Sequence, residues 1–197
     1  MRTVTYGGAA SLDGFLAGPH GALDWLHFSQ DVQQIIAAYW KTIDTVLMGR
    51  KTYSASLAAQ GRPTKRKSAR SAKAKAKAKA TTIRTYVFSR TLTEVDDPGV
   101  EVVSSDATEF VRNLKAQPGK DICLMGGGEL AQSLLGGGVV DKVGLNIHPI
   151  LLGHGIPVFR DTGRRILLKL TDCRPLDGGC LLANYDVISQ LKSAPNR

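Results

Sequence analysis

The chain has 197 residues, of which 43% are hydrophobic and 22% are charged, values that indicate one folded globular domain and exclude a disordered or fibrous protein. No stretch approaches the roughly 18 consecutive apolar residues of a membrane-spanning helix, and residues 1–6 lack the apolar core of a signal peptide, so we expect a cytoplasmic protein. The three cysteines, Cys123, Cys173 and Cys180, have neither CxxC spacing nor a neighbouring histidine pair, so we expect buried thiols and no metal site.

The net charge of +9 comes from one low-complexity segment, a basic insert at residues 62–81. From Lys65 to Lys79 there are eight basic residues and no acidic one, so removing these eight charges from +9 leaves the rest of the chain at +1. The alternation of lysine and alanine would place lysine all around a helix, so we expect a solvated surface loop. A weak, nonspecific contact with nucleic acid through this insert is the alternative use of the segment.

Strands and helices are predicted to alternate along most of the chain. In chain order, we expect a strand at 3–10, a loop at 11–19, a helix at 30–41, a strand at 44–48, a helix from 49, strands at 85–88 and 100–103, a helix at 107–117, a strand at 121–125 and a helix from 126. Ser29 is placed to cap the first helix, and short apolar runs such as 44–48 are typical of strands buried on both faces. This alternation predicts an α/β fold with helices on both faces of a largely parallel sheet.

The end of the chain has a different pattern. Residues 142–151, 165–171 and 180–189 are strand-like runs without a helix between them, so we expect them to close the sheet as an antiparallel edge and to make it mixed. We expect residues 1–191 to form a single three-layer domain and residues 192–197 to form a flexible tail.

A glycine turn at residues 48–52 follows one of the buried strands and predicts an anion site. In an open α/β sheet, ligands bind at the carboxyl ends of the strands, where helix N-termini direct backbone N–H groups at anions. Gly49 permits a close approach of the backbone. Arg50, Lys51 and Thr52 supply two positive charges and a hydroxyl group for phosphates.

A second glycine turn, at residues 125–129, and a polar pair between the two turns complete the pattern. The triple glycine lets the chain wrap around a pyrophosphate, and Ser89 with Arg90 suits a ribose 2′-phosphate, which favours NADP over NAD. A glycine run is also compatible with a tight helix entry that binds nothing, and Arg50 and Lys51 with solvated charges. Cations at a helix N-terminus oppose its dipole, however, which favours a bound anion. The turns lack the GxGxxG pattern, so the prediction depends on all three strand ends together.

An ordered set of motifs extends this prediction to a known family. The motifs are Ser11-Leu12-Asp13-Gly14, Leu23-Asp24-Trp25, residues 48–53, Val87-Phe88-Ser89-Arg90, residues 125–130 and Pro149-Ile150-Leu151-Leu152-Gly153. They resemble the dihydrofolate reductase superfamily, and within it the small stand-alone bacterial proteins similar to the C-terminal reductase domain of the bifunctional riboflavin-biosynthesis deaminase/reductase. This resemblance, interrupted only by the basic insert, implies a mixed eight-stranded sheet, NADPH as the hydride donor and a homodimer.

The resemblance also implies which residues bind the cofactor. Ala9 or Ala10 and Leu16 would contact the nicotinamide amide, and the two glycine turns and the polar pair would hold the phosphates. The complete set is Ala9, Ala10, Leu16, Gly49, Arg50, Lys51, Thr52, Ser89, Arg90, Thr91, Gly126, Gly127, Gly128, Glu129 and Leu130.

Two carboxylates are candidates for the proton that must accompany a hydride. Asp13 resembles the acidic residue that riboflavin-type reductases carry in the same motif, and Asp31, six residues after Trp25, resembles the carboxylate that holds the pterin ring in dihydrofolate reductases. The alternatives are that Asp13 shapes a turn and that Asp31 complements a helix dipole.

Trp25 and Asn146 are candidates for contacts with a substrate ring, whereas His148 is expected to be a packed histidine. Dihydrofolate reductases have proline where this chain has Asp24, so the resemblance favours a riboflavin-type substrate, 5-amino-6-(5-phosphoribosylamino)uracil, over folate. The expected activity is therefore NADPH-dependent reduction of a heterocyclic or sugar-derived C=N bond. A dihydrofolate or pteridine reductase and a non-enzymatic nucleic-acid-associated protein are the alternatives.

Overall fold

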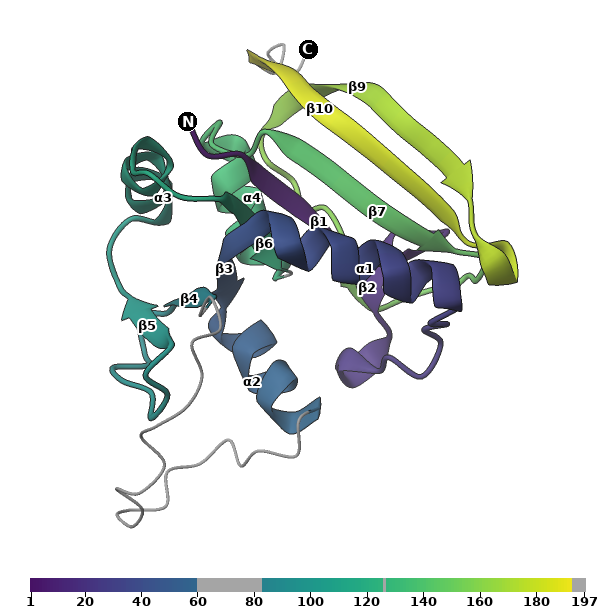
Figure 1. Ribbon diagram of the computed structural model, residues 1–197, viewed down its shortest axis with the longest axis horizontal. Helices are drawn as coiled ribbons and strands as arrows, with labels where there is room; N and C mark the ends of the chain where they lie inside the picture. The colour runs from purple at the N-terminus through teal and green to yellow at the C-terminus, as the bar shows by residue number, and fades with distance from the viewer. Residues whose placement is uncertain (60–82, 126, 193–197) are drawn as a thin grey trace.

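The computed structural model describes residues 1–59, 83–125 and 127–192, which form one eight-stranded sheet with helices on both faces (Figure 1). Across the sheet the strands are β5 (Val100–Val103), β4 (Arg84–Phe88), β3 (Ile43–Gly49), β6 (Asp121–Met125), β1 (Val4–Ser11), β7 (Lys142–His148), β10 (Leu181–Lys192) and β9 (Arg164–Pro175). The helices are α1 (Gln30–Thr42), α2 (Arg50–Ala59), α3 (Ala107–Ala116) and α4 (Gly128–Gly136). A two-stranded sheet pairs β2 (Phe15–Ala17) with β8 (Ile156–Pro157), and short turns form η1 (Pro19–Gly21) and η2 (Asp177–Gly179).

Two apolar layers join the helices to the sheet, as predicted for strands buried on both faces. Neighbouring residues of β3 divide between the layers, because successive side chains of a strand point to opposite faces. Leu47 packs in the layer beneath α3 and α4, and Val46 packs in the layer beneath α1 and α2. The predicted three-layer arrangement is therefore confirmed. Among the described helices, none combines the length and the apolar character needed to cross a membrane.

The antiparallel edge is confirmed, but it consists of β9 and β10 alone. β7 pairs parallel with β1, because α4 returns the chain to the starting end of the sheet before β7 begins. β10 then pairs antiparallel with both β7 and β9. Figure 1 shows β9 and β10 extending beyond the helices. Cys123 and Cys180 are buried as expected, whereas the expectation was wrong for Cys173, which is exposed on the outermost strand.

The basic insert predicted at 62–81 lies outside the described residues. So does the tail predicted at 192–197, apart from Lys192 at the end of β10. Their expected roles stay predictions.

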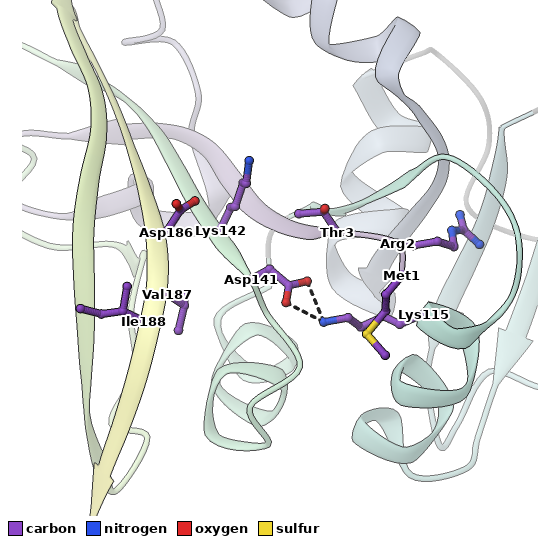
Figure 2. A pocket seen from close by; sticks show the side chains of 9 residues that line it. All are labelled: Met1, Arg2, Thr3, Lys115, Asp141, Lys142, Asp186, Val187 and Ile188. Atoms are coloured by element: carbon purple, nitrogen blue, oxygen red, sulfur yellow. Dashed lines mark hydrogen bonds and ion pairs between the residues drawn. The ribbon is translucent and has the colours of Figure 1, made fainter.

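A hollow of about 390 Å³ lies where β1 and β7 begin, and the buried Lys115 and the half-buried Asp141 lie in its wall (Figure 2). Lys115 is 8% exposed, and its Nζ donates to both carboxylate oxygens of Asp141 at 2.7 Å and to the carbonyl of Val139 at 3.1 Å. Asp141 also accepts a hydrogen bond from the backbone N–H of Val4 at 2.8 Å. These charged groups bind one another, so we interpret this end of the sheet as structural.

Candidate functional site

The carboxyl ends of the parallel strands lie at one edge of the sheet, and the central strand β1 is open there. β6 ends opposite Gly7, whereas β1 continues beside β7 as far as Ser11. Among the described strands, none pairs with the β6-facing edge of residues 8–11. Ala9, which is half-buried, and Ala10, which is buried, lie in this stretch.

The two predicted glycine turns meet at this edge. A methyl group built on Gly127 would lie 3.2 Å from Thr52 Oγ1 and 3.8 Å from the backbone nitrogen of Gly49. Gly127 has φ +84°, a conformation that side chains rarely adopt, so glycine is required for the turns to come this close. α2 begins at Arg50, and its first turn contains Arg50 and Lys51 but no acidic residue. Both cations are exposed and oppose the helix dipole unless an anion binds.

The turn after β4 lies next to the first glycine turn, because Phe88 pairs in register with Gly49. Its shape comes from the hydroxyl of Ser89, which accepts a hydrogen bond from the backbone N–H of Thr91 at 3.1 Å. Arg90 is exposed at the tip of this turn. The structure thus brings the predicted 2′-phosphate residues beside the predicted pyrophosphate residues.

The start of α4 contains the remaining predicted cofactor residues and is contacted by Arg160, which the sequence did not predict. Gly126 lies outside the described residues. Gly128 is buried against Arg160, whose Nε would lie 3.0 Å from a methyl group built on the glycine. Arg160 also lies 3.9 Å from Glu129. Leu130 is part of the core.

Asp13 joins two loops beside the site. Its carboxylate accepts hydrogen bonds from the Ser11 hydroxyl at 2.6 Å and from the backbone N–H groups of Leu152 at 3.1 Å and Gly153 at 2.7 Å. The Ser11 hydroxyl, followed by the two backbone donors, lowers the pKa of Asp13. This geometry favours an anchoring role, and a catalytic role stays a prediction. Leu16, on β2 behind this loop, is half-buried against the core.

Asp31 joins the start of α1 to the tip of the β9–β10 hairpin. Ser29 occupies the N-cap position, but the prediction that its side chain caps the helix was wrong, because its hydroxyl donates to Asp31 and accepts no hydrogen bond from a backbone N–H of the first turn. The other carboxylate oxygen of Asp31 accepts from the backbone N–H of Asp177 at 2.9 Å. The Ser29 hydroxyl and then the Asp177 backbone lower the pKa of Asp31. Asp31 is therefore ionised at neutral pH, and its predicted catalytic role is not tested by this geometry.

The two predicted substrate residues converge on His148. The ring of Trp25 packs edge-on against the imidazole, with centroids 5.2 Å apart at 88°. Asn146 Nδ2 lies 3.2 Å from His148 Nε2. His148 is 2% exposed at the end of β7, as expected of a packed histidine. Burial, with a smaller contribution from His27, lowers its pKa, so the ring is neutral at pH 7.

Sequence reasoning missed two parts of this region. Arg160 follows a short strand in a segment without a charge pattern, and only the fold brings it against α4. His27 contacts the tip of the β9–β10 hairpin, where a methyl group built on Gly178 would lie 2.6 Å from the imidazole. This contact also joins residues that are far apart in the chain. The φ of +77° at Gly178 explains why glycine occupies this position. Nothing in the neighbouring sequence indicates the contact with His27.

The strand order, the antiparallel edge and the glycine turns at one end of the parallel strands define a protein with a dihydrofolate-reductase-like fold. The family model described as RibD C-terminal domain matches residues 2–182, and the chain belongs to this family.

Relatives and solved structures agree with this membership. The chain is 36% identical over 185 residues to the protein YyaP of Bacillus subtilis (strain 168), covering 94% of this chain and 95% of YyaP. A putative riboflavin biosynthesis protein from Shewanella sp. PV-4 is 24% identical, with a TM-score of 0.75 over 96% of this chain and all of that one. A pyrimidine reductase-like protein from Corynebacterium diphtheriae is 16% identical, with a TM-score of 0.69 over 95% of this chain and 92% of that one. At these identities, the two structures confirm the fold.

Proposed function

We propose that the protein is an NADPH-dependent reductase of the riboflavin-biosynthesis type, which transfers hydride to a heterocyclic or sugar-derived C=N bond. The observation that carries the proposal is the meeting of the glycine turns, with Gly127 against Thr52 and two cations at the start of α2, whose first turn contains no acidic residue. Membership in the RibD C-terminal domain family supports the proposal, as do the likeness to a putative riboflavin biosynthesis protein from Shewanella and to a pyrimidine reductase-like protein from Corynebacterium.

The described residues fit a phosphorylated dinucleotide. The approach of Gly127 to Thr52 forms a cradle that any side chain at position 127 would fill. The start of α2, with Arg50 and Lys51, would hold the pyrophosphate, and Arg90 the 2′-phosphate. The backbone of Ala9 and Ala10, on the open edge of β1, would bind the nicotinamide carboxamide. When bound, NADPH supplies the hydride.

Asp13 and Asp31 are the candidates for controlling protonation of the substrate, since hydride transfer to a C=N bond leaves a nitrogen that must gain a proton. Both are ionised in the free protein because hydroxyl and backbone donors stabilise their charge. Either carboxylate would therefore act after substrate displaces one of these hydrogen bonds, or by ordering the water that delivers the proton.

A comparison of substrates tests the proposal directly. With NADPH in excess, we expect NADPH oxidation in the presence of 5-amino-6-(5-phosphoribosylamino)uracil, monitored by the loss of nicotinamide absorbance. Dihydrofolate and a dihydropterin serve as comparison substrates, because Asp31 and Trp25 also resemble a pterin site. Faster oxidation with dihydrofolate would replace the riboflavin-type substrate with a pteridine, and no oxidation with any of the three would contradict the reductase proposal.

We also propose that the protein is a homodimer that covers β9. This strand is at the edge of the sheet and is 12 residues long, and its Leu167, Leu168 and Leu170 are 44%, 39% and 51% exposed. A long apolar edge strand favours aggregation unless another chain covers it. A second copy of the same chain provides matching apolar surface.

Light scattering after size-exclusion chromatography should give a mass of roughly twice the 21.1 kDa chain. Replacing Leu168 and Leu170 together by glutamate should give the single-chain mass, because the buried interface would then contain unpaired charges. Lys169→Glu, between them on the strand, is the matched control and should remain dimeric. A wild-type protein that is monomeric at micromolar concentration would exclude this interface.

A further inference from the structure

Asn146 has a buried polar atom without a partner. Its side-chain oxygen is buried and, within the described part of the chain, accepts no hydrogen bond. Asn146 pairs in register with Ala9 of β1, so both side chains project from the same face of the sheet. An unsatisfied buried polar group costs about 1–3 kcal/mol, which favours a position that a ligand completes.

His148 determines which atom of the Asn146 amide occupies that position. Its Nδ1 lies 3.5 Å from the backbone nitrogen of His27 and 3.5 Å from Cys180 Sγ. A backbone N–H can only donate, so Nδ1 is the acceptor and carries no proton. Since the buried ring is neutral, its single proton is on Nε2, which faces Asn146.

A protonated Nε2 and the amide nitrogen of Asn146 cannot bond to each other, because both are donors. The two ends of an asparagine amide exchange by a half-turn about its last side-chain bond, and hydrogen bonding decides between the two orientations. The Asn146 oxygen therefore belongs beside His148 Nε2, where it accepts. The amide nitrogen then takes the buried position and presents two N–H donors.

We propose that His148 is a positioning residue that holds the Asn146 amide nitrogen toward the substrate, where it donates to a carbonyl oxygen or unprotonated ring nitrogen of a heterocycle. The location of the substrate rests on the proposed reductase function, because Ala9, the register partner of Asn146, is expected to contact the nicotinamide. Such a donor selects a ring with an acceptor at this point and rejects one with an N–H group there.

The first test determines the protonation of His148 in the full-length, ligand-free protein. In a long-range proton–nitrogen NMR spectrum of nitrogen-15-labelled protein, we expect Nδ1 to have the shift of an unprotonated ring nitrogen and Nε2 that of a protonated one. The spectrum of the His148→Gln variant assigns the signals by their disappearance. A proton on Nδ1 would overturn the inference whatever the substrate is.

The second test determines the direction of the Asn146 hydrogen bond, with 5-amino-6-(5-phosphoribosylamino)uracil as the probe. Asn146→Asp keeps the shape and still accepts from His148, but it presents an oxygen where the amide nitrogen was. We expect KM to rise roughly 10- to 100-fold while kcat stays within about threefold, because the lost contact serves substrate binding. An unchanged KM would show that substrate binding uses no N–H donor of Asn146, and the inference would be wrong.

The third test separates positioning from packing at His148. His148→Gln keeps an N–H donor for Asn146 and should preserve KM within about threefold, whereas His148→Phe should raise KM as Asn146→Asp does. NADPH affinity and thermal unfolding, measured alongside, identify a variant that has lost its fold. Equal KM values for the two variants would overturn the positioning role. If the wild type reduced none of the candidate substrates, the proposed function would fail, and the His148 protonation state alone would decide this inference.

Discussion

Replacing Arg50 and Arg90 together by alanine should weaken NADPH binding roughly 100-fold or more, because each arginine contributes a charge-assisted hydrogen bond worth about 1.5–3 kcal/mol before solvent screening. Arg50 is at the start of α2, and Arg90 is at the tip of the adjacent turn. Titration of NADPH and NADH, followed by nicotinamide fluorescence, measures both affinities. Arg90→Ala alone should remove most of the preference for NADPH, because only NADPH has the 2′-phosphate.

The matched control is Arg84→Ala, which removes the same charge from the opposite end of the same strand, β4. This variant should bind NADPH as the wild type does. Deleting residues 65–79, within the predicted basic insert, should also leave the affinity unchanged. If the deletion abolished binding, the insert would be part of the cofactor site, and if the wild type bound neither nucleotide, the reductase proposal would be lost.

Asp141→Ala should destabilise the protein by up to about 3 kcal/mol, the low end of the usual cost of leaving a buried charge without its partner, because the Asp141 side chain is itself 40% exposed. Among the described residues, Lys115 would keep only the carbonyl of Val139 as an acceptor, and the backbone N–H of Val4 would lose the Asp141 carboxylate. Chemical denaturation measures the change in the free energy of unfolding.

Asp186→Ala is the control for this experiment, because Asp186 lines the same hollow (Figure 2) but is not a partner of Lys115. The effect of Asp186→Ala on the free energy of unfolding should be small. Replacing Lys115 and Asp141 together by methionine and leucine should recover much of the lost stability, since neither charge of the pair is then left without its partner. A loss of less than about 1 kcal/mol in Asp141→Ala would show that Lys115 reaches water once its partner is gone.

Local sequence patterns predicted the elements of this fold well where the signal is itself local. The apolar run of β3 and the helical spacing of α1 each arise from a few neighbouring residues, and the structure places both elements where they were expected. The glycine turns were also predictable, because glycine is needed for the conformation that Gly127 adopts.

Other features depend on contacts between distant residues, which one sequence does not reveal. Asp31 meets Asp177 across 146 positions, so nothing near either residue shows that its carboxylate is occupied by a backbone N–H. The parallel direction of β7 follows from the crossover through α4, which a strand pattern alone does not contain. The role inferred for His148 is equally hidden in the sequence, because its sequence neighbourhood indicates only packing. The contacts with His27 and Asn146 indicate which ring nitrogen carries the proton.

The open edge of β1 has a consequence for how a ligand is recognised. β1 continues past the end of its neighbour β6. The backbone N–H and C=O groups on that side of β1 keep the spacing with which strands hydrogen-bond to one another in a sheet. A planar carboxamide has the donor and acceptor of one peptide group, so it can extend the sheet by a single unit. In the proposed nicotinamide site, a carboxylate would have no N–H to donate and would carry a charge, so the backbone itself would discriminate against nicotinic acid derivatives, without any side chain that a substitution could alter.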